Sequence, residues 1–449
     1  MSTPASEPAP GLLEAPARFV AVASLVARIY GGYKAIQLGG RLGWRDRGAR
    51  YRRHHRWSAE GAYRLAIRLQ GLPIKVCQFL GSRADILPAE YVTVLSRLQD
   101  RVPPRALAAF APVLVEALGP AWRARFAALD SRPLAAASLA QVHRGRLADG
   151  REVAVKIQYP EIARLVALDL RNLGFLVRVL ARLEPEFDFR IVLDEVRKYV
   201  PRELDFVAEA ASATRIRANL AGRADVLVPA IVPELSSRRV LVMEYVPGVR
   251  ITDRDGLARL DLDPKELARR LIELYCEQIL VHGFFHADPH PGNILVQPDG
   301  RLVLLDFGLA KELPPGFREG IGALTAAIVR GDRAAVAAAF RALGFRTRGA
   351  SDESLAWLGD AFLGWALKSG RAYADPEMVN RFSAELPGVM RANPLIAIPG
   401  DVLLIGRVLG LLSGIGKQLG SEVDVAAILL PYLARSPGGQ SATGDAAAS

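Results

Sequence analysis

The sequence predicts an α+β fold of two lobes, a small strand-rich lobe followed by a larger helical lobe, with a helical extension in front of them. Helical periodicity dominates from about Gly11 to Ala128, and the pattern changes to β-branched strands at Leu134. A mainly helical remainder then runs from about Pro264 to Leu433. The Pro247-Gly248 pair is typical of a turn and is expected to form the hinge between the two lobes. We therefore assign residues 11–128 to the extension, 129–247 to the small lobe and 248–435 to the larger lobe.

Local signals place the elements within these regions. In the extension, Tyr63, Ile67 and Gln70 fall at helical spacing, and Pro103-Pro104 separates two helices. In the small lobe, Asp149-Gly150 supplies a hairpin turn. Strands are expected at residues 138–147, 152–157, 226–228 and 239–245, and helices at residues 160–183 and 191–220.

Length and composition are those of a globular protein. With 449 residues, 51% of them hydrophobic, the chain can bury the cores of two or more lobes. Cys77 and Cys276 are far apart and form no metal-ligand spacing, so a reducing, cytoplasmic setting is expected. The Pro/Ala/Ser-rich residues 1–10 and the Gly/Ser/Ala-rich residues 436–449 are expected to be disordered.

Much of the net charge of +11 lies in one basic run beside Tyr51 and Trp57. The run consists of Arg41, Arg45, Arg47, Arg50, Arg52, Arg53 and Arg56, with His54 and His55. A solvated helix face and a contact with an anionic membrane both explain such a run. No nucleic-acid-binding motif accompanies it, so no nucleic-acid partner is expected.

We expect no signal peptide and no transmembrane helix. The first ten residues lack the positive charge of a signal peptide. The apolar stretch from Phe19 to Ile29 is interrupted by Arg28 and is too short to cross a bilayer. The stretch from Val402 to Ile415 is interrupted by Arg407 and by several glycines.

Two short motifs in the larger lobe indicate phosphoryl transfer. The chain reads H-A-D-P-H-P-G-N from His286 to Asn293 and D-F-G from Asp306 to Gly308. A lone D-F-G is also an ordinary turn, but the two motifs in this order, separated by a predicted β-hairpin, favour a function. Such a site holds metal ions on the phosphates and places one carboxylate near the attacking oxygen. Asn293 and Asp306 are hard oxygen ligands suited to Mg²⁺, which leaves Asp288 for the acceptor.

A cation is also needed on the phosphates, and Lys156 is the candidate. It ends the segment V-A-V-K on a predicted strand, where a protein kinase has its phosphate-binding lysine, although a strand lysine facing solvent is the simpler alternative. Asp205 and Glu209, at i and i+4, are expected on one helical face, with Glu203 offset from both. Glu209 best suits pairing with Lys156, and Asp205 could reach the metal. Together these parts predict a protein-kinase-like bilobal fold with nucleotide between the lobes.

The glycine-rich phosphate loop of such a fold is replaced by small residues. They are Ala135, Ala136, Ala137 and Ser138. Alanines narrow the backbone choices that glycines leave open, so this loop could approach phosphates but would be stiffer, and a small-residue strand edge is the alternative. Before Pro247, the backbone of Glu244 and Val246 would offer hydrogen bonds to adenine.

The alanine loop, the Glu-x-Asp sequence at Glu203, H-A-D-P-H-P-G-N and D-F-G together resemble the UbiB/AarF family of atypical kinase-like proteins. Members of that family support coenzyme Q (isoprenoid quinone) biosynthesis in bacteria and mitochondria. The resemblance extends from about Ile74 to beyond Lys311. The family also carries an N-terminal K-x-G-Q element, which reads K-V-C-Q here from Lys75. Cys77 replaces the glycine, so the close helix packing of that element is not expected to follow the family unchanged.

The resemblance implies that the K-x-G-Q helices cover the cleft in which a kinase receives a protein substrate. Lys75 and Gln78 would cap the active site, with Lys75 close to Glu203. A covered cleft implies ATP hydrolysis or action on a small or lipid substrate. The resemblance also implies peripheral contact with a membrane, anionic lipid or a quinone precursor as a ligand, and quinone-biosynthesis enzymes as partners.

The sequence therefore predicts a phosphoryl-transfer protein that binds ATP (or ADP) and Mg²⁺. Lys156 would orient the α and β phosphates. His286 and His290 would shape the loop, since an oxygen-ligated Mg²⁺ needs no imidazole. One alternative is a small-molecule kinase of the aminoglycoside or choline type, against which the alanine loop and the Lys75-x-x-Gln78 element argue. The other is a nucleotide-binding pseudokinase scaffold, against which the complete set of metal- and phosphate-binding residues argues.

Overall fold

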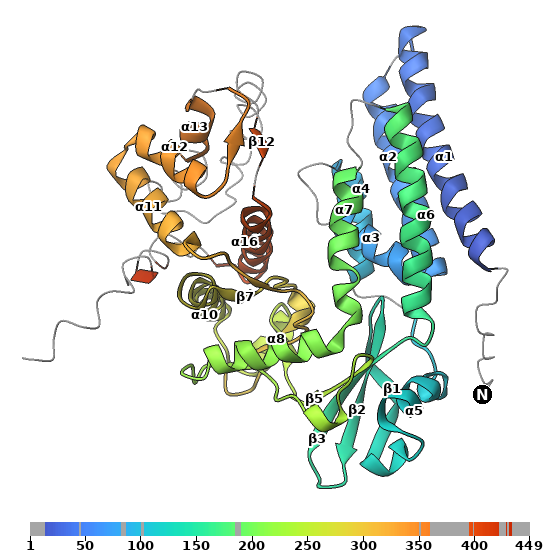
Figure 1. The fold of residues 1–449 in the computed structure, drawn as a ribbon, viewed down its shortest axis with the longest axis vertical. Coiled ribbons are helices and arrows are strands. Elements are labelled where there is room, and N and C mark those ends of the chain that lie inside the picture. Colours follow the sequence, from blue (N-terminus) through green and yellow to red (C-terminus); the bar gives the residue numbers. More distant parts are fainter. Residues whose placement is uncertain are drawn as a thin grey trace, which may run out of the picture. The chain divides into compact units, whose positions relative to one another are not determined.

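The structure, a computed structural model, describes residues 14–44, 46–81, 87–99, 103–184, 190–349, 352–359, 395–397, 399–421, 428 and 431–432. The disorder expected for residues 1–10 and 436–449 concerns segments outside this set, as does Arg45 of the basic run. The chain forms two compact units, whose elements are labelled in Figure 1. The first unit contains the residues up to Ala211 and Ala230–Tyr245, and the second contains Ser212–Pro229 and the residues from Val246 onward.

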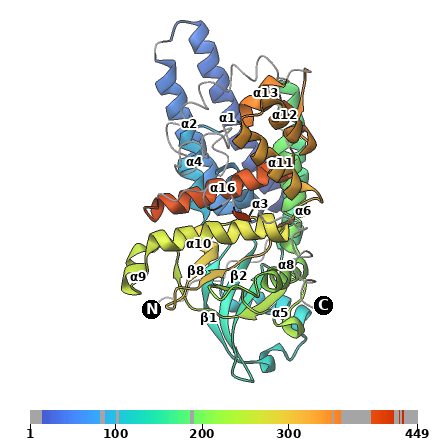
Figure 2. The same cartoon turned by 90° about the vertical axis from the view of Figure 1, so that its left-hand side faces the viewer.

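The first unit begins with a helical hairpin. Its two helices, α1 (Glu14–Arg41) and α2 (Arg47–Leu69), pack against each other, as Figure 2 shows, and α1 also contacts α6 (Ile162–Leu183). Asp46 caps α2 by accepting a hydrogen bond from the Ala49 N–H at 3.2 Å. Helices α3 (Leu72–Gly81) and α4 (Ala89–Leu95) pack on α2.

Helix α1 is longer than the sequence indicated. The exposed Arg28 was expected to interrupt the apolar stretch, but its Nε donates to the Ser24 carbonyl one turn earlier, so the helix continues. The segment Pro16–Arg41 is long and apolar enough to cross a membrane by length and composition, which the expectation of no transmembrane helix had not allowed for. A core helix or a signal sequence passes the same test.

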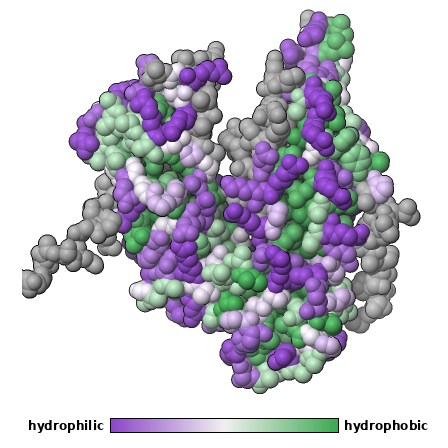
Figure 3. Space-filling model, viewed as in Figure 1, coloured by the Kyte–Doolittle hydropathy of each residue, from purple (hydrophilic) through white to green (hydrophobic). Residues whose placement is uncertain are grey.

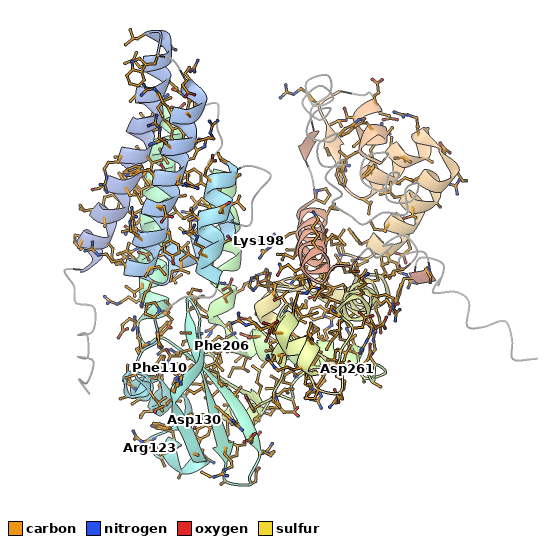
Figure 4. All side chains as sticks on the ribbon, turned by 180° about the vertical axis from the view of Figure 1, so that it is seen from behind. Phe110, Arg123, Asp130, Lys198, Phe206 and Asp261 are labelled. Carbon is orange, nitrogen blue, oxygen red and sulfur yellow. The ribbon has the colours of Figure 1, made fainter. Side chains whose placement is uncertain are left out.

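A four-stranded antiparallel sheet forms the centre of the first unit. Its strand order is β1 (Phe126–Ala136), β2 (Ala140–Leu147), β3 (Glu152–Gln158), β5 (Val240–Glu244). Val153, Val155 and Ile157 alternate into a core that contains Phe110, labelled in Figure 4, and the short helix α5 (Ala111–Leu118). Strand β1 begins at Phe126, earlier than the predicted change at Leu134, because its register shifts hide the alternation that marks a strand.

The helix predicted over residues 191–220 is broken. The structure has α7 (Arg190–Tyr199), a 3₁₀ turn at Arg202–Leu204 and α8 (Phe206–Asn219). Asp205 is extended between them, with φ −116° and ψ 90°, so it does not share a helical face with Glu209 as expected. Pro201 lacks an N–H and disfavours a continuing helix, and Asp is a preferred cap, which explains why α8 starts afresh after Asp205.

In its described residues, the second unit contains one four-stranded sheet, two two-stranded sheets, the end of α8 and the helices from α9 onward. The first sheet has the order β4 (Val226–Leu227), β9 (Leu302–Leu304), β8 (Ile294–Val296), β6 (Val249–Arg250), and the second pairs β7 (Phe284–His286) with β10 (Ala310–Glu312). The described helices after α8 are α9 (Arg254–Arg259), α10 (Pro264–Glu277), α11 (Phe317–Arg330), α12 (Arg333–Ala342), α13 (Glu353–Gly359) and α16 (Gly400–Gln418). Strands β11 (Arg346–Thr347) and β12 (Leu395–Ala397) form the third sheet, a short antiparallel pair. Residues 212–229 had been assigned to the small lobe, but β4 pairs with β9 and places this segment in the second unit.

Candidate active site

The H-A-D-P-H-P-G-N loop begins where β7 ends. The Ala287 N–H donates to the Leu309 carbonyl at 2.8 Å, which ties the loop to the chain after the D-F-G motif. His286 is fully buried, and its Nε2 lies 2.8 Å from the Asp306 carbonyl while its Nδ1 lies 2.9 Å from the Tyr275 hydroxyl. The carbonyl requires a proton on Nε2, so Nδ1 accepts from Tyr275. His286 therefore joins the two motifs.

The β8–β9 hairpin brings Asn293 and Asp306 to the same end of the sheet. Ile294 pairs with Leu304, and the Leu305 N–H donates to the Asn293 carbonyl at 2.8 Å, so Asp306 follows directly. Asp306 has a left-handed backbone, with φ 59°, and an exposed side chain.

Asn293 and Asp306 supply amide and carboxylate oxygens, as Mg²⁺ prefers. The Asn293 side-chain N–H donates to the Asp288 carbonyl at 3.3 Å, so its oxygen is the atom that would ligate a metal, and one Asp306 oxygen accepts from the Gly308 N–H at 3.4 Å. In the described part of the chain, no group of three or more His, Cys, Asp or Glu residues could hold a metal ion. Mg²⁺ takes few protein ligands and keeps several waters, so this pair fits Mg²⁺ bound through phosphate oxygens.

Asp288, the candidate for the acceptor, forms an ion pair that the sequence did not reveal. Arg407 Nη2 on α16 lies 3.0 Å from Asp288 Oδ1. The same helix reaches the strand after the D-F-G motif, because Asp401 pairs with Lys311 at 2.8 Å. Sequence reasoning had noted Arg407 only as a charge in an apolar stretch, and a separation of 119 residues gave no signal for the pair.

In the first unit, Lys156 contacts a carboxylate that the sequence had proposed. Lys156 Nζ lies 2.7 and 3.0 Å from the two oxygens of Glu209 and 5.1 Å from the centre of the Phe206 ring. The side chains of Lys156 and Glu209 are 12% and 3% exposed, so little water screens the pair. Strand β3 and helix α8 thus hold an ammonium and a carboxylate together, as a phosphate-binding lysine requires.

The K-x-G-Q-like element lies on α3 in the same unit. Lys75 forms an ion pair with Glu203, and the Gln78 side chain donates to the Leu98 carbonyl at 3.0 Å. Cys77 is buried in a cluster that includes Ile74 and Leu98, and burial raises the pKa of its thiol to about 12. The cluster thus accommodates the side chain that replaces glycine.

The other predicted site residues make the following contacts. Asp205 Oδ1 accepts from the Val207 N–H at 3.1 Å, and its Oδ2 accepts from Arg238 at 3.0 Å, so it caps α8 and is paired with a cation. The Glu244 N–H donates to the Ala230 carbonyl, so a bond from Glu244 to adenine would have to use its carbonyl oxygen. Val246 is buried.

The alanine loop joins β1 to β2. Ala135 and Ala136 end β1, the Ala137 N–H donates to the Ala140 carbonyl at 2.8 Å, and Ser138 is buried. Ala136 packs on the cluster that contains Cys77. The loop is therefore braced by the helical extension.

Comparisons with known proteins identify the family to which this chain is similar. Residues 97–340 match the ABC1 atypical kinase-like domain. The chain is 34% identical over 386 residues to AarF domain-containing protein kinase 1 of Gallus gallus, covering 84% of this chain and 73% of that protein. It is 42% identical over 262 residues to Protein ACTIVITY OF BC1 COMPLEX KINASE 8, chloroplastic, of Arabidopsis thaliana, covering 57% of this chain and 34% of that protein.

A solved structure supports the fold. "The complex structure of Rv3197-erythromycin from Mycobacterium tuberculosis" is 27% identical, has a TM-score of 0.59, and is matched over 82% of this chain and 94% of that chain. The α+β, protein-kinase-like fold expected from the sequence is thereby confirmed. The chain spans only 34% of the Arabidopsis relative and 51% of the AarF domain-containing protein kinase 1 of Xenopus tropicalis. The match over residues 97–340 and the Gallus gallus relative together show that the chain belongs to the ABC1/AarF (UbiB) family of atypical kinase-like proteins.

Proposed function

We propose that this protein binds Mg²⁺-ATP and transfers its terminal phosphoryl group to water or to a small or lipid acceptor. The observation that carries the proposal is the pairing of Lys156 with Glu209 in one unit and of Asn293 with Asp306 in the other. Phosphoryl transfer depends on positioning and charge, and these are the cation and the metal ligands that it needs. Mg²⁺ would neutralise charge on the phosphates when bound.

Each residue then has one task. Lys156 would bind the α and β phosphates, and Glu209 holds its ammonium in place. Asn293 and Asp306 would hold the metal. Asp288 would accept the proton of the attacking hydroxyl. Asp205 is a weaker candidate for the metal than the sequence suggested, since it already caps α8 and pairs with Arg238.

The Lys75–Glu203 pair supports a small or lipid acceptor rather than a protein. It joins the helical extension to the segment before α8, within the first unit. By the family resemblance, this element covers the site at which a kinase would receive a protein. Support of quinone biosynthesis, with its enzymes as partners, is part of the same proposal.

Phosphate release tests the proposal. We expect purified protein to bind ATP and release phosphate with Mg²⁺, and to lose both the release and most of the nucleotide affinity with EDTA. Binding without release, with or without anionic vesicles and quinone precursors, would support the pseudokinase scaffold instead. Release only after an amino alcohol or aminoglycoside is added would support a small-molecule kinase.

We further propose that the α1–α2 hairpin contacts an anionic membrane. Residues 14–69 contain twelve basic and three acidic residues, which accounts for nine of the net +11 charges. Figure 3 shows hydrophobic and hydrophilic surface side by side at the tip of this hairpin. Leu38, Leu42, Trp44 and Trp57 are 58%, 73%, 44% and 42% exposed, and Arg50 lies over the Trp44 ring at 4.5 Å. Exposed tryptophan among arginines suits a lipid headgroup layer.

Neutralising three of these arginines tests the membrane contact. Changing Arg47, Arg50 and Arg53 to Gln should weaken binding to anionic vesicles by about 10²-fold, since each basic residue near such a surface contributes about 1 kcal/mol. Added salt should weaken wild-type binding in the same way. The control variant changes Arg125, Arg132 and Arg146 to Gln. These three arginines are exposed elsewhere in the first unit. Vesicle binding that is unaffected by salt and by the changes at Arg47, Arg50 and Arg53 would contradict a surface contact and favour insertion of α1.

A further inference from the structure

Helix α16 is joined to the candidate active site by two ion pairs of opposite polarity. Arg407 binds the Asp288 carboxylate, and Asp401 binds Lys311 on β10. Strand β10 pairs with β7, with Lys311 opposite Phe285, and β7 leads into Asp288. One helix therefore contacts both the residue proposed to receive the acceptor's proton and the strand that supports it.

Stability alone does not account for the Arg407–Asp288 pair. Both side chains are 31% exposed, and ion pairs in contact with water contribute little to folding. Arg407 Nε is also buried without a hydrogen-bond partner in the described structure. An arginine fixed for stability would be expected to use this donor, because an unsatisfied buried N–H opposes folding.

The chemistry of the loop gives the pair a role. Between Asp288 and Asn293 the chain reads P-H-P-G, with no lysine or arginine, so the loop itself places no permanent cation beside the carboxylate. Arg407 supplies that charge from a helix beyond residues 97–340, the segment that matches the family domain. A general base acts only when its carboxylate is held in the geometry that the proton transfer requires.

We propose that Arg407 is a positioning residue for Asp288: it fixes Oδ1 so that Oδ2 faces the acceptor. This inference rests on the proposed phosphoryl transfer. As the acceptor oxygen forms its bond to the terminal phosphorus, the bond from that phosphorus to the departing ADP oxygen breaks. The acceptor's proton goes to Asp288 Oδ2.

The test separates turnover from binding. In full-length Arg407→Met, kcat for phosphate release with Mg²⁺-ATP should fall about 10- to 100-fold, the usual effect of losing a residue that orients an active group. The KM for ATP should stay within about twofold of wild type, because Arg407 is proposed to position Asp288 and not to bind the nucleotide. Arg407→Lys should recover part of the loss. The control is Arg330→Met, at an exposed position of α11 in the same unit, which should match wild type.

A double-mutant cycle then asks whether Arg407 acts through Asp288. In an Asp288→Asn background, measured by single turnover, Arg407→Met should add less than about twofold, since the carboxylate that it positions is gone. Full additivity, or an Arg407→Met kcat equal to that of the control, would overturn the inference while leaving the proposed function intact. Wild-type protein that binds ATP but never releases phosphate would instead overturn both. If Arg407→Met fails to fold, Arg407→Lys takes its place in the cycle.

Discussion

Asp306→Asn is expected to lower kcat for phosphate release about 10³-fold, because a metal ion supplies several kcal/mol of charge stabilisation and about 1.4 kcal/mol corresponds to a factor of ten. The loss should fall on catalysis rather than folding. Asp306 has φ 59°, in the left-handed region that asparagine tolerates better than most residues. The amide oxygen can also keep the hydrogen bond from the Gly308 N–H.

The β8–β9 hairpin, which precedes Asp306, offers a matched control. Asp299 lies in the exposed β8–β9 turn, where it pairs with Arg301, so Asp299→Asn makes the same chemical change away from the candidate metal ligands. Phosphate release, Mg²⁺ dependence of ATP affinity and thermal unfolding should be measured for both variants. An Asp306→Asn protein with the turnover of Asp299→Asn would remove Asp306 from the metal site.

Motifs that are short in sequence could be predicted, because their geometry is fixed locally. Asn293 and Asp306 flank a tight β-hairpin, so the sequence was enough to expect them together. The choice of Glu209 for Lys156 followed from the type of partner that such a lysine requires, and the structure places the two within 2.7 Å.

What could not be predicted depends on contacts distant in sequence or on local breaks. No pattern connects Arg407 to Asp288, since their contact arises from the packing of α16 in the second unit. The break after Pro201 is the opposite case. Pro201 in the sequence indicates a break, but the i and i+4 spacing of Asp205 and Glu209 favoured one continuous helix, and that prediction was wrong. The length of α1 was underestimated because Arg28 suggested an interruption of the apolar stretch, whereas an arginine can remain within a helix.

A buried ion pair holds α1 to α6, and removing one of its partners should strongly destabilise the hairpin. Arg18 Nε donates to Asp169 Oδ1 at 3.1 Å, its Nη2 binds the other oxygen, and its Nη1 donates to the Leu69 carbonyl at 2.6 Å. The two side chains are only 5% and 8% exposed. Burial raises the pKa of Asp169 above its ordinary value, and Arg18 opposes that shift.

Arg18→Met is expected to destabilise the packing of α1 by about 3 to 5 kcal/mol at neutral pH, because it leaves a buried carboxylate without its counter-charge. Denaturant unfolding and hydrogen exchange of α1 would measure the loss. Exposed Arg28→Met on the same helix should change little. Arg18→Met/Asp169→Leu should recover most of the stability, since a hydrophobic pair of similar volume replaces the ion pair.

The pH dependence of this variant follows from the sign of the shift. A carboxylate whose pKa is raised in the folded state binds its proton more tightly there, so its ionisation removes stability as the pH rises through that pKa. Without Arg18 the pKa of Asp169 rises further, since the opposing cation is gone. The deficit should therefore be small near about pH 4, the ordinary range of an aspartate, and should grow as the pH rises from there to neutral. A deficit that stays constant over this range would show that lost packing by the arginine stem, not an uncompensated charge, is what destabilises the variant.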